Sequence, residues 1–303
     1  MAILDNEDFR GFLTRIYPGL VIDDVPAPSG QRVVYFCHFE PDPALENEWP
    51  EWGNVVLKVS EGVSAQAIAY IQREIEILNR LAHPGYPTLL YDDVISEDPD
   101  TEVKLNPKLF VTIEERIDAQ PLSELAENFC DENSVIDLLT KLILILKPLW
   151  EGRPPLVHRD LKPANILITP SNDVVVIDLG IVREEGASGV TFSAVAHGPC
   201  TPKYASPEQA INDKRNISFK SDFFALATLC YELLTGSNPY QEEDDLVEDV
   251  LDKVCNKIPE SLHSLGLASE DFSRIIQKMM EKHPYKRHRK IEDLVVEIEA
   301  IRS

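Results

Sequence analysis

The side chains best suited to chemistry gather in one short string of the sequence. This string, HRDLKPAN, runs from His158 to Asn165, and the tripeptide DLG follows at residues 178–180. Carboxylate and amide oxygens are hard ligands that suit Mg²⁺, which usually also keeps several waters. Any one of these polar groups alone could simply satisfy a tight loop. The whole set, in this order, favours a catalytic loop over that structural interpretation.

The elements around this string must hold it in place. Two short apolar segments, residues 165–168 and 174–177, flank Ser171-Asn172-Asp173 and predict a small hairpin between the two motifs. Residues 133–150 are apolar and predict a helix ahead of the string, with Asn133 or Ser134 as its N-cap. Residues 181–203 lack periodicity and predict a loop. Further helices are expected at residues 221–235, 243–256, 270–281 and 291–302.

The first third of the chain has a different character. β-branched and aromatic runs predict strands at residues 33–38, 54–59, 88–95 and 109–117. Residues 64–82 carry apolar side chains at helical spacing and predict one long helix. We therefore expect a mostly β subdomain with one main helix, followed from Pro121 by a mostly helical part.

Together with the segment CTPKYASPE at residues 200–208, these motifs resemble those of the protein kinase family. They are most similar to eukaryotic-like (Hanks-type) Ser/Thr protein kinases, and the SPEQ ending resembles the bacterial ones. The resemblance covers roughly residues 30–300. It implies an α+β, bilobal fold that forms a single protein kinase domain over residues 1–303. The β-rich N-lobe would span about 1–117 and the C-lobe about 118–303, with ATP in the cleft between them.

The resemblance also implies transfer of the γ-phosphoryl group of ATP to Ser or Thr hydroxyls of proteins, including the kinase itself. Such transfer needs reactants held in line and charge neutralised, with little covalent chemistry by the protein. Asp160 would accept the hydroxyl proton, and Lys162 would approach the γ-phosphate as in Ser/Thr-specific members. Asn165 and Asp178 would ligate Mg²⁺, with Mn²⁺ as an alternative.

The strand VVLKV at residues 55–59 resembles the kinase strand whose lysine holds the α- and β-phosphates of ATP. In the family this lysine pairs with a glutamate of the following helix, so Lys58 is expected to pair with Glu74. Glu76 is the rival partner. Glu74 is preferred because it lies one turn before Leu78, on the side of the helix expected to face the core.

Four further residues are expected to support the catalytic loop. By resemblance, Thr201 contacts the catalytic aspartate and lysine and helps to select Ser/Thr substrates. Glu208 is expected to form a buried ion pair with Arg287. Asp222 is expected to support the backbone of the loop from a helix.

Regulation by phosphorylation is a further expectation from the resemblance. In the family, the arginine at the position of Arg159 often pairs with a phosphate on the activation segment and orders it. Residues 181–201 form that segment here, and autophosphorylation is expected on Thr191 or Ser193. Two alternatives stay open: Arg159 meets an acidic residue instead, or the segment is ordered without modification.

The expected nucleotide site departs from the family pattern in its phosphate loop and its hinge. The loop keeps one glycine, Gly30, beside Ser29, where the family has three that let the backbone approach the phosphates. The hinge would present the backbone of Glu115 and Ile117 to adenine, in a register that is uncertain by one residue. It also puts Glu114 behind adenine, where a buried carboxylate is costly unless it is paired.

These departures keep other functions in consideration. The poor phosphate loop leaves open a pseudokinase that acts as a binding or scaffold module. A small-molecule kinase of related fold is disfavoured, because such relatives lack the SPE segment and its arginine partner. ATP turnover separates the first alternative from an active kinase.

Composition constrains the partners and the compartment. The chain carries 52 Asp and Glu against 29 Lys and Arg, a net charge of −23. This disfavours nucleic acid and anionic membranes and favours a basic protein substrate, although the charge could simply serve solubility. The basic run at residues 285–290 is interpreted as a solvated helix junction around Arg287 rather than an anion site.

Five cysteines without CxxC spacing and an acidic N-terminus without a signal-peptide pattern favour a cytoplasmic protein.

Overall fold

The structure of the chain is a computed structural model. It describes residues 5–26, 32–41, 49–81, 83–179, 183–184 and 200–302. The chain divides into two compact units, Met1–Asp118 and Ala119–Ser303, which are described separately below.

The first unit is built on an antiparallel sheet with one helix on each face. Its elements are α1 (Glu7–Ile16), β1 (Leu20–Asp24), β2 (Arg32–Phe39), the 3₁₀ helix η1 (Trp49–Trp52), β3 (Asn54–Glu61), α2 (Ala65–Arg80), β4 (Leu89–Glu97) and β5 (Lys104–Glu115). In the described residues the sheet has five strands in the order β1-β2-β3-β5-β4. The predicted strands and the long helix are therefore confirmed.

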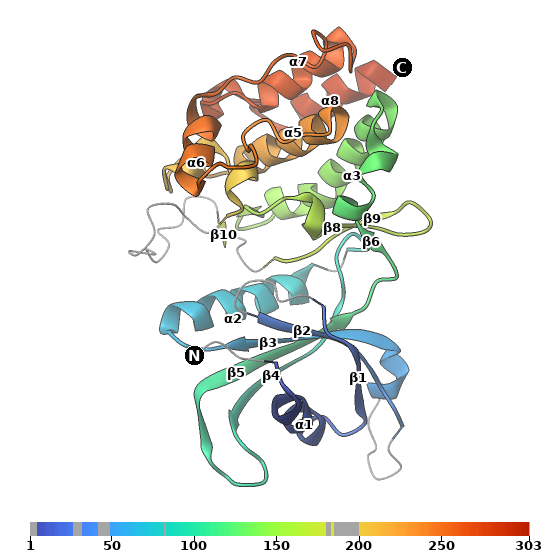
Figure 1. Ribbon diagram of the computed structural model, residues 1–303, viewed down its shortest axis with the longest axis vertical. Helices are drawn as coiled ribbons and strands as arrows, with labels where there is room; N and C mark the ends of the chain where they lie inside the picture. Colours follow the sequence, from blue (N-terminus) through green and yellow to red (C-terminus); the bar gives the residue numbers. More distant parts are fainter. Residues whose placement is uncertain are drawn as a thin grey trace. The chain divides into compact units, whose positions relative to one another are not determined.

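The two faces of this sheet differ in polarity because successive side chains of a strand point to opposite faces. One set of alternate residues is buried in a core with α1 that includes Leu13, Tyr35, Leu57 and Val111. Figure 1 shows α1 and α2 on opposite faces of the sheet. The face turned toward α2 therefore carries the other set of alternate residues, among them Lys58.

The N-terminal helix α1 is absent from the predictions above. The Asn6 side chain caps it by accepting a hydrogen bond of 2.8 Å from the N–H of Phe9. Phe9, Phe12, Leu13 and Ile16 follow the i, i+3, i+4, i+7 spacing of an amphipathic helix, and this spacing is the signal that would have found it.

The second unit is mostly helical, as expected. Its longer elements are α3 (Glu132–Trp150), α5 (Phe219–Thr235), α6 (Val247–Asn256), α7 (Glu270–Met279) and α8 (Ile291–Arg302). Its short helices are η2 (Leu122–Glu124), η3 (Ala126–Phe129), η4 (Pro163–Asn165), η5 (Pro202–Tyr204), α4 (Pro207–Ala210) and η6 (Pro284–Lys286). Its strands are β6 (Gln120–Pro121), β7 (Leu156–Val157), β8 (Ile166–Ile168), β9 (Val174–Val176) and β10 (Arg183–Glu184).

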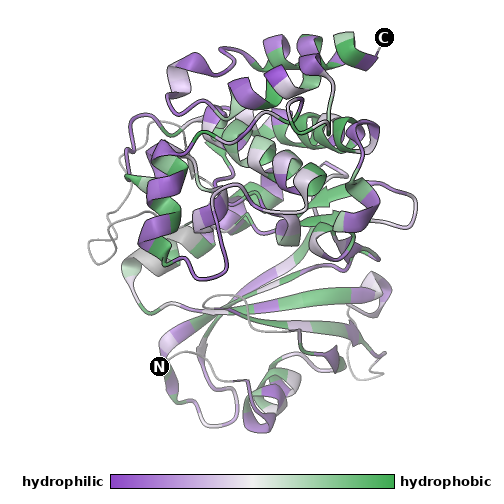
Figure 2. Cartoon of the chain, turned by 45° about the horizontal axis from the view of Figure 1, so that its top comes forward, coloured by the Kyte–Doolittle hydropathy of each residue, from purple (hydrophilic) through white to green (hydrophobic). Residues whose placement is uncertain are grey.

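Helices α3 and α5 form the centre of this unit, and most of their residues are buried. The surrounding helices carry apolar residues (green) on some faces and polar residues (purple) on others, as Figure 2 shows. α5 ends at Gly236, whose left-handed backbone (φ 72°) suits the residue that terminates a helix.

Two predictions of local structure need correction. The N-cap of α3 is Asp131, not Asn133 or Ser134, because its carboxylate accepts the N–H bonds of both those residues. The predicted loop at residues 181–203 contains the short strand β10, which pairs with β7. The predicted hairpin is confirmed, since β8 pairs with β9 in antiparallel register.

Replacing Leu13 by alanine should lower the free energy of unfolding by about 2–5 kcal/mol, because the leucine is fully buried between α1 and the sheet. The matched control is Leu144→Ala in α3, where the residue is 56% exposed and the change should stay within about 0.5 kcal/mol. Urea unfolding followed by circular dichroism measures both. Equal effects of the two substitutions would show that α1 does not belong to the core.

Candidate active site

The backbone of the catalytic loop is held by one buried carboxylate on α5, that of Asp222. Asp222 has no exposed surface and accepts hydrogen bonds from the backbone N–H groups of His158 and Arg159, both at 2.9 Å. The indole N–H of Trp150, at the end of α3, donates a third bond at 2.7 Å. Burial raises the pKa of Asp222, and these donors act against that shift. The support predicted for Asp222 is present in the structure, and Trp150 is a partner that the sequence did not reveal.

The loop then turns so that Asp160 meets three side chains of the predicted set. Arg159 adopts a left-handed backbone (φ 74°), which is uncommon for a residue with a side chain. Lys162 Nζ donates to Asp160 Oδ2 at 2.7 Å, and Asn165 Nδ2 approaches the same oxygen at 3.2 Å. Thr201 donates to Asp160 Oδ1 from its N–H at 2.9 Å and from its hydroxyl at 2.7 Å.

These contacts set the charge of Asp160. Burial on its own would raise the pKa of this carboxyl, but the bonds from Lys162 and Thr201 outweigh burial and lower the pKa below its usual value. Asp160 is therefore ionised at neutral pH.

Asp178 follows directly on the hairpin that begins at Asn165. The N–H of Ile177 donates to the backbone oxygen of Asn165 at 3.0 Å, so the strand leading to Asp178 is tied to the catalytic loop. Asp178 has a left-handed backbone (φ 64°), and the next residue, Leu179, is buried. Asn165 and Asp178 thus lie at the two ends of one hairpin, which this backbone bond closes.

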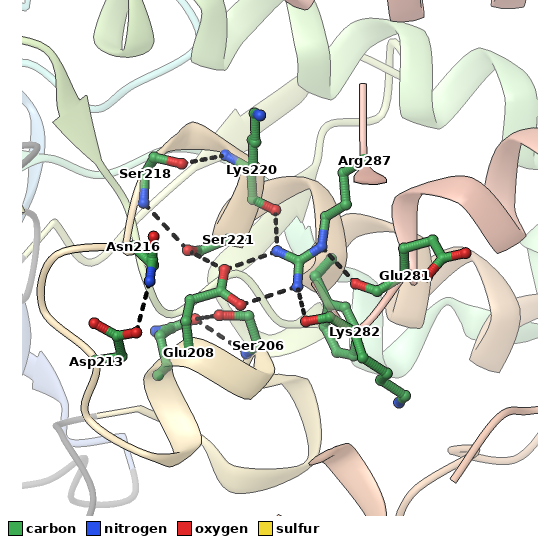
Figure 3. Close-up of polar contacts among 12 residues, drawn as sticks. Ser206, Glu208, Asp213, Asn216, Ser218, Lys220, Ser221, Glu281, Lys282 and Arg287 are labelled. Atoms are coloured by element: carbon green, nitrogen blue, oxygen red, sulfur yellow. Dashed lines mark hydrogen bonds and ion pairs between the residues drawn. The ribbon is translucent and has the colours of Figure 1, made fainter. Parts of the chain in front are cut away.

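The predicted ion pair between Glu208 and Arg287 is present and fully buried (Figure 3). The guanidinium donates two parallel bonds to the carboxylate, at 2.7 and 2.9 Å. Ser221 donates to the same carboxylate at 2.6 Å, and Arg287 also donates to the backbone oxygens of Glu281, Lys220 and Lys282. Both carboxylate oxygens of Glu208 and all three guanidinium nitrogens of Arg287 are therefore hydrogen-bonded.

Gln209, which the sequence did not single out, links this ion pair to the catalytic loop. Its side-chain N–H donates to the backbone oxygen of Arg159 at 2.9 Å, and its side-chain oxygen accepts from Ser206. Its position directly after Glu208, in the SPEQ string, is the signal that could have drawn attention to it. The segment that carries Thr201 is thereby fixed to the loop at two points.

The basic run at residues 285–290 mixes exposed and buried side chains: Lys286, Arg289 and Lys290 are exposed, whereas two residues are buried. Tyr285 is 71% exposed, but Arg287 and His288 are each 1% exposed. Burial lowers the pKa of His288, although Glu297 accepts a hydrogen bond from its ring. The interpretation as a helix junction around Arg287 holds, with His288 as a second buried residue that was not foreseen.

In the first unit, Lys58 does not have the expected partner. Its Nζ donates to Glu114 at 2.7 Å, while Glu74 receives two bonds from the guanidinium of Arg32. The expected pair of Lys58 with Glu74 is therefore wrong for this structure. The choice of Glu74 over Glu76 as the inward-facing glutamate is right, because Glu74 is 3% exposed and Glu76 is exposed.

The remaining predicted residues lie at the hinge or outside the described residues. Glu115 is the last residue of β5 and its N–H donates to the backbone oxygen of Thr88, while Ile117 lies beyond the strand. Their contact with adenine stays a prediction. Ser29 and Gly30, and the expected phosphorylation sites Thr191 and Ser193, lie outside the described residues.

Comparison with known proteins decides the family. Residues 53–295 match the family described as the protein kinase domain. The chain belongs to this family. Together with the sheet of the first unit and the helices of the second, this confirms the predicted α+β, bilobal kinase fold. No helix in the described part of this kinase is both long and apolar enough to cross a bilayer.

Several bacterial relatives align with part of the kinase. The serine/threonine-protein kinase PknB of Mycobacterium tuberculosis is 35% identical over 133 residues, which are 44% of this chain and 21% of PknB. PknL of the same species is 30% identical over 165 residues, 53% of this chain and 40% of PknL. A probable serine/threonine-protein kinase of Streptomyces coelicolor is 33% identical over 153 residues, 50% of this chain and 22% of the relative. The chain thus spans less than half the length of these relatives.

Replacing Glu208 by glutamine should lower the free energy of unfolding by about 3–5 kcal/mol, because it leaves the charge of Arg287 buried without a counter-charge. The matched control is Glu281→Gln. The carboxylate of Glu281 faces Lys286 at 3.9 Å, and the two side chains are 41% and 50% exposed, so its loss should change stability by less than about 1 kcal/mol. Denaturant unfolding of both variants measures this, and a Glu208 variant as stable as its control would contradict the importance of the buried pair.

Proposed function

We propose that this chain is a Ser/Thr protein kinase that transfers the γ-phosphoryl group of ATP to Ser and Thr hydroxyls of proteins, including its own. The observation that carries the proposal is the bonding of Asp160 to Lys162 and Thr201 on a loop fixed by Asp222. Positioned charges of this kind are what phosphoryl transfer requires of a protein.

In the proposed reaction, Asp160 accepts a hydrogen bond from the substrate hydroxyl and finally its proton. The hydroxyl oxygen forms a bond to the γ-phosphorus as the bond from that phosphorus to the β-bridging oxygen breaks, and ADP leaves with the electron pair. Lys162 lies 2.7 Å from Asp160, so its charge is placed to offset the charge of the transferring group.

The bonds to Asp160 indicate how the substrate hydroxyl gains access. A carboxylate has about four acceptor positions, and four donors already approach the two oxygens of Asp160. A substrate hydroxyl must therefore replace one donor. The amide of Asn165 makes the longest of the four contacts, at 3.2 Å, and is the donor most easily exchanged.

Asn165 and Asp178 are the residues proposed to hold Mg²⁺, which Mn²⁺ could replace. Asn165 uses its amide N–H on Asp160, which leaves its side-chain oxygen as a ligand, and Asp178 supplies a carboxylate. No three His, Cys, Asp or Glu residues gather into a metal cluster in the described residues. A site with two protein ligands fits Mg²⁺, which takes one or two side chains and completes its shell with phosphates and water. The metal would neutralise phosphate charge.

The substrate and compartment are proposed from charge and cysteine chemistry. The net charge of −23 favours a basic protein substrate through electrostatic steering. All five cysteines are free thiols, which suits the reducing cytoplasm. Autophosphorylation on Thr191 or Ser193, and pairing of such a phosphate with Arg159, complete the proposal.

Asp160→Asn should lower phosphoryl transfer by about 10²–10⁴-fold while the fold remains intact, because the amide cannot take the hydroxyl proton. The assay follows labelled phosphate from ATP and Mg²⁺ into a basic protein and into the chain itself. Asp173→Asn, which replaces an exposed aspartate in the turn of the adjacent hairpin, is the matched control and should keep full activity.

Chelation of divalent ions should abolish transfer, and Mg²⁺ or Mn²⁺ should restore it. ATP binding without transfer by the unmodified chain would favour a pseudokinase, and equal activity of Asp160→Asn would overturn its assignment.

A further inference from the structure

Four charged residues of the first unit form two ion pairs on one face of the sheet. Lys58 pairs with Glu114 at 2.7 Å, and Arg32 pairs with Glu74 through both guanidinium N–H groups. Glu114 also accepts a hydrogen bond from Thr112. These pairs differ from the expected pairing of the lysine with the helix glutamate.

The strand register explains why Lys58 reaches Glu114. Lys58 of β3 lies directly opposite Thr112 of β5, and Val56 lies opposite Glu114. Glu114 is thus a diagonal neighbour of Lys58 on the same face, at a separation that two long side chains can bridge. The register of the two strands and the alternation of side chains along each strand therefore bring Lys58 and Glu114 together, whatever the position of α2.

The same rule makes Arg32 a neighbour of the lysine on this face. Lys58 lies opposite Val34 of β2, so Arg32, two residues before Val34, is its diagonal neighbour on the other side. From there the guanidinium reaches Glu74 on α2. The two cations thus share one sheet face, and each has its own carboxylate.

Burial makes this arrangement of charges a strong constraint. Glu74 and Glu114 are each 3% exposed, and a buried carboxylate without a cationic partner is costly. Two cations and two carboxylates balance in charge. If Lys58 moved to Glu74, Glu114 would lose its bond from the ammonium and keep the hydroxyl of Thr112.

The pKa of Lys58 reflects the same balance. Burial on its own lowers the pKa of this ammonium, but the charges of Glu114 and then Glu74 outweigh burial, and the net pKa lies above its usual value. The ammonium is therefore charged at neutral pH. It has three N–H donors, and Glu114 uses one of them, which leaves two for an anion.

We propose that Glu114 is the residue that positions Lys58 for the nucleotide phosphates, in place of Glu74, and that Arg32 holds Glu74. This inference rests on the proposed function only in assuming that Lys58 meets the nucleotide. Glu114 acts through Lys58, so it is a positioning residue.

The pairing is tested first without nucleotide, by urea unfolding of charge-removed variants. Glu114→Gln should lower the folded-to-unfolded ratio by at least about tenfold in the native background. In a Lys58→Met background the same change should be neutral or stabilising, because it removes a stranded carboxylate. Glu74→Gln should also be destabilising in the native background. Its effect should disappear in an Arg32→Met background and persist in a Lys58→Met background. Coupling of Lys58 to Glu74 instead of Glu114 would overturn the proposal.

The nucleotide role is tested by the dissociation constant of ATP with Mg²⁺, measured by calorimetry. Glu114→Gln should weaken binding by about tenfold, which is the loss expected for one misplaced charged contact. The effect should vanish in the Lys58→Met background, and Glu74→Gln should weaken binding less. Unchanged or tighter binding by Glu114→Gln would overturn the positioning role. Absence of ATP binding by the unmodified chain, with the unfolding couplings intact, would instead overturn the proposed function.

Discussion

The carboxylate of Asp222 is the interaction on which the rest of the catalytic loop depends. It is fully buried, and three N–H donors from the end of α3 and from the loop itself converge on it. Burial disfavours the charged form of this carboxyl, and these donors partly replace the water it has lost. The backbone of His158 and Arg159 is thereby fixed, and the next residue along is Asp160. Asp222 thus acts on the site through the backbone of the loop.

Buried charges organise both units in the same way. In the second unit the pair of Glu208 and Arg287 fixes the segment after Thr201, and Gln209 links that segment to the loop. In the first unit Glu114 and Glu74 each have a cation on the face of the sheet toward α2. Removing one partner of such a pair lowers the stability of the fold by more than the intact pair contributes, because the other charge stays buried without a counter-charge. Each pair therefore specifies the position of two distant segments of the chain.

The contacts of the loop and its supports were predicted well, because their motifs resemble those of protein kinases closely enough to be matched residue by residue. Asp160, Lys162 and Asn165 lie within six residues, and Thr201, Asp222 and Arg287 were found at their expected contacts. The partner of Lys58 could not be predicted from spacing, because it depends on the register of β3 against β5, which places Glu114 diagonally across from the lysine. Helix α1 escaped prediction although its apolar spacing was present, and Asp131 was missed because an N-cap lies outside the apolar pattern that reveals the helix.

The most direct measurement is the turnover number of Asp222→Asn at saturating ATP, normalised to the folded fraction seen by circular dichroism. An amide keeps the shape of the carboxylate but turns its own N–H toward one of the three donors, so the loop should shift and Asp160 with it. We predict that turnover falls by about 10²-fold, the cost of a small misplacement of a reacting group, while the affinity for ATP changes far less. Turnover that fell only in proportion to the loss of folded protein would contradict the dependence of the catalytic loop on this buried charge.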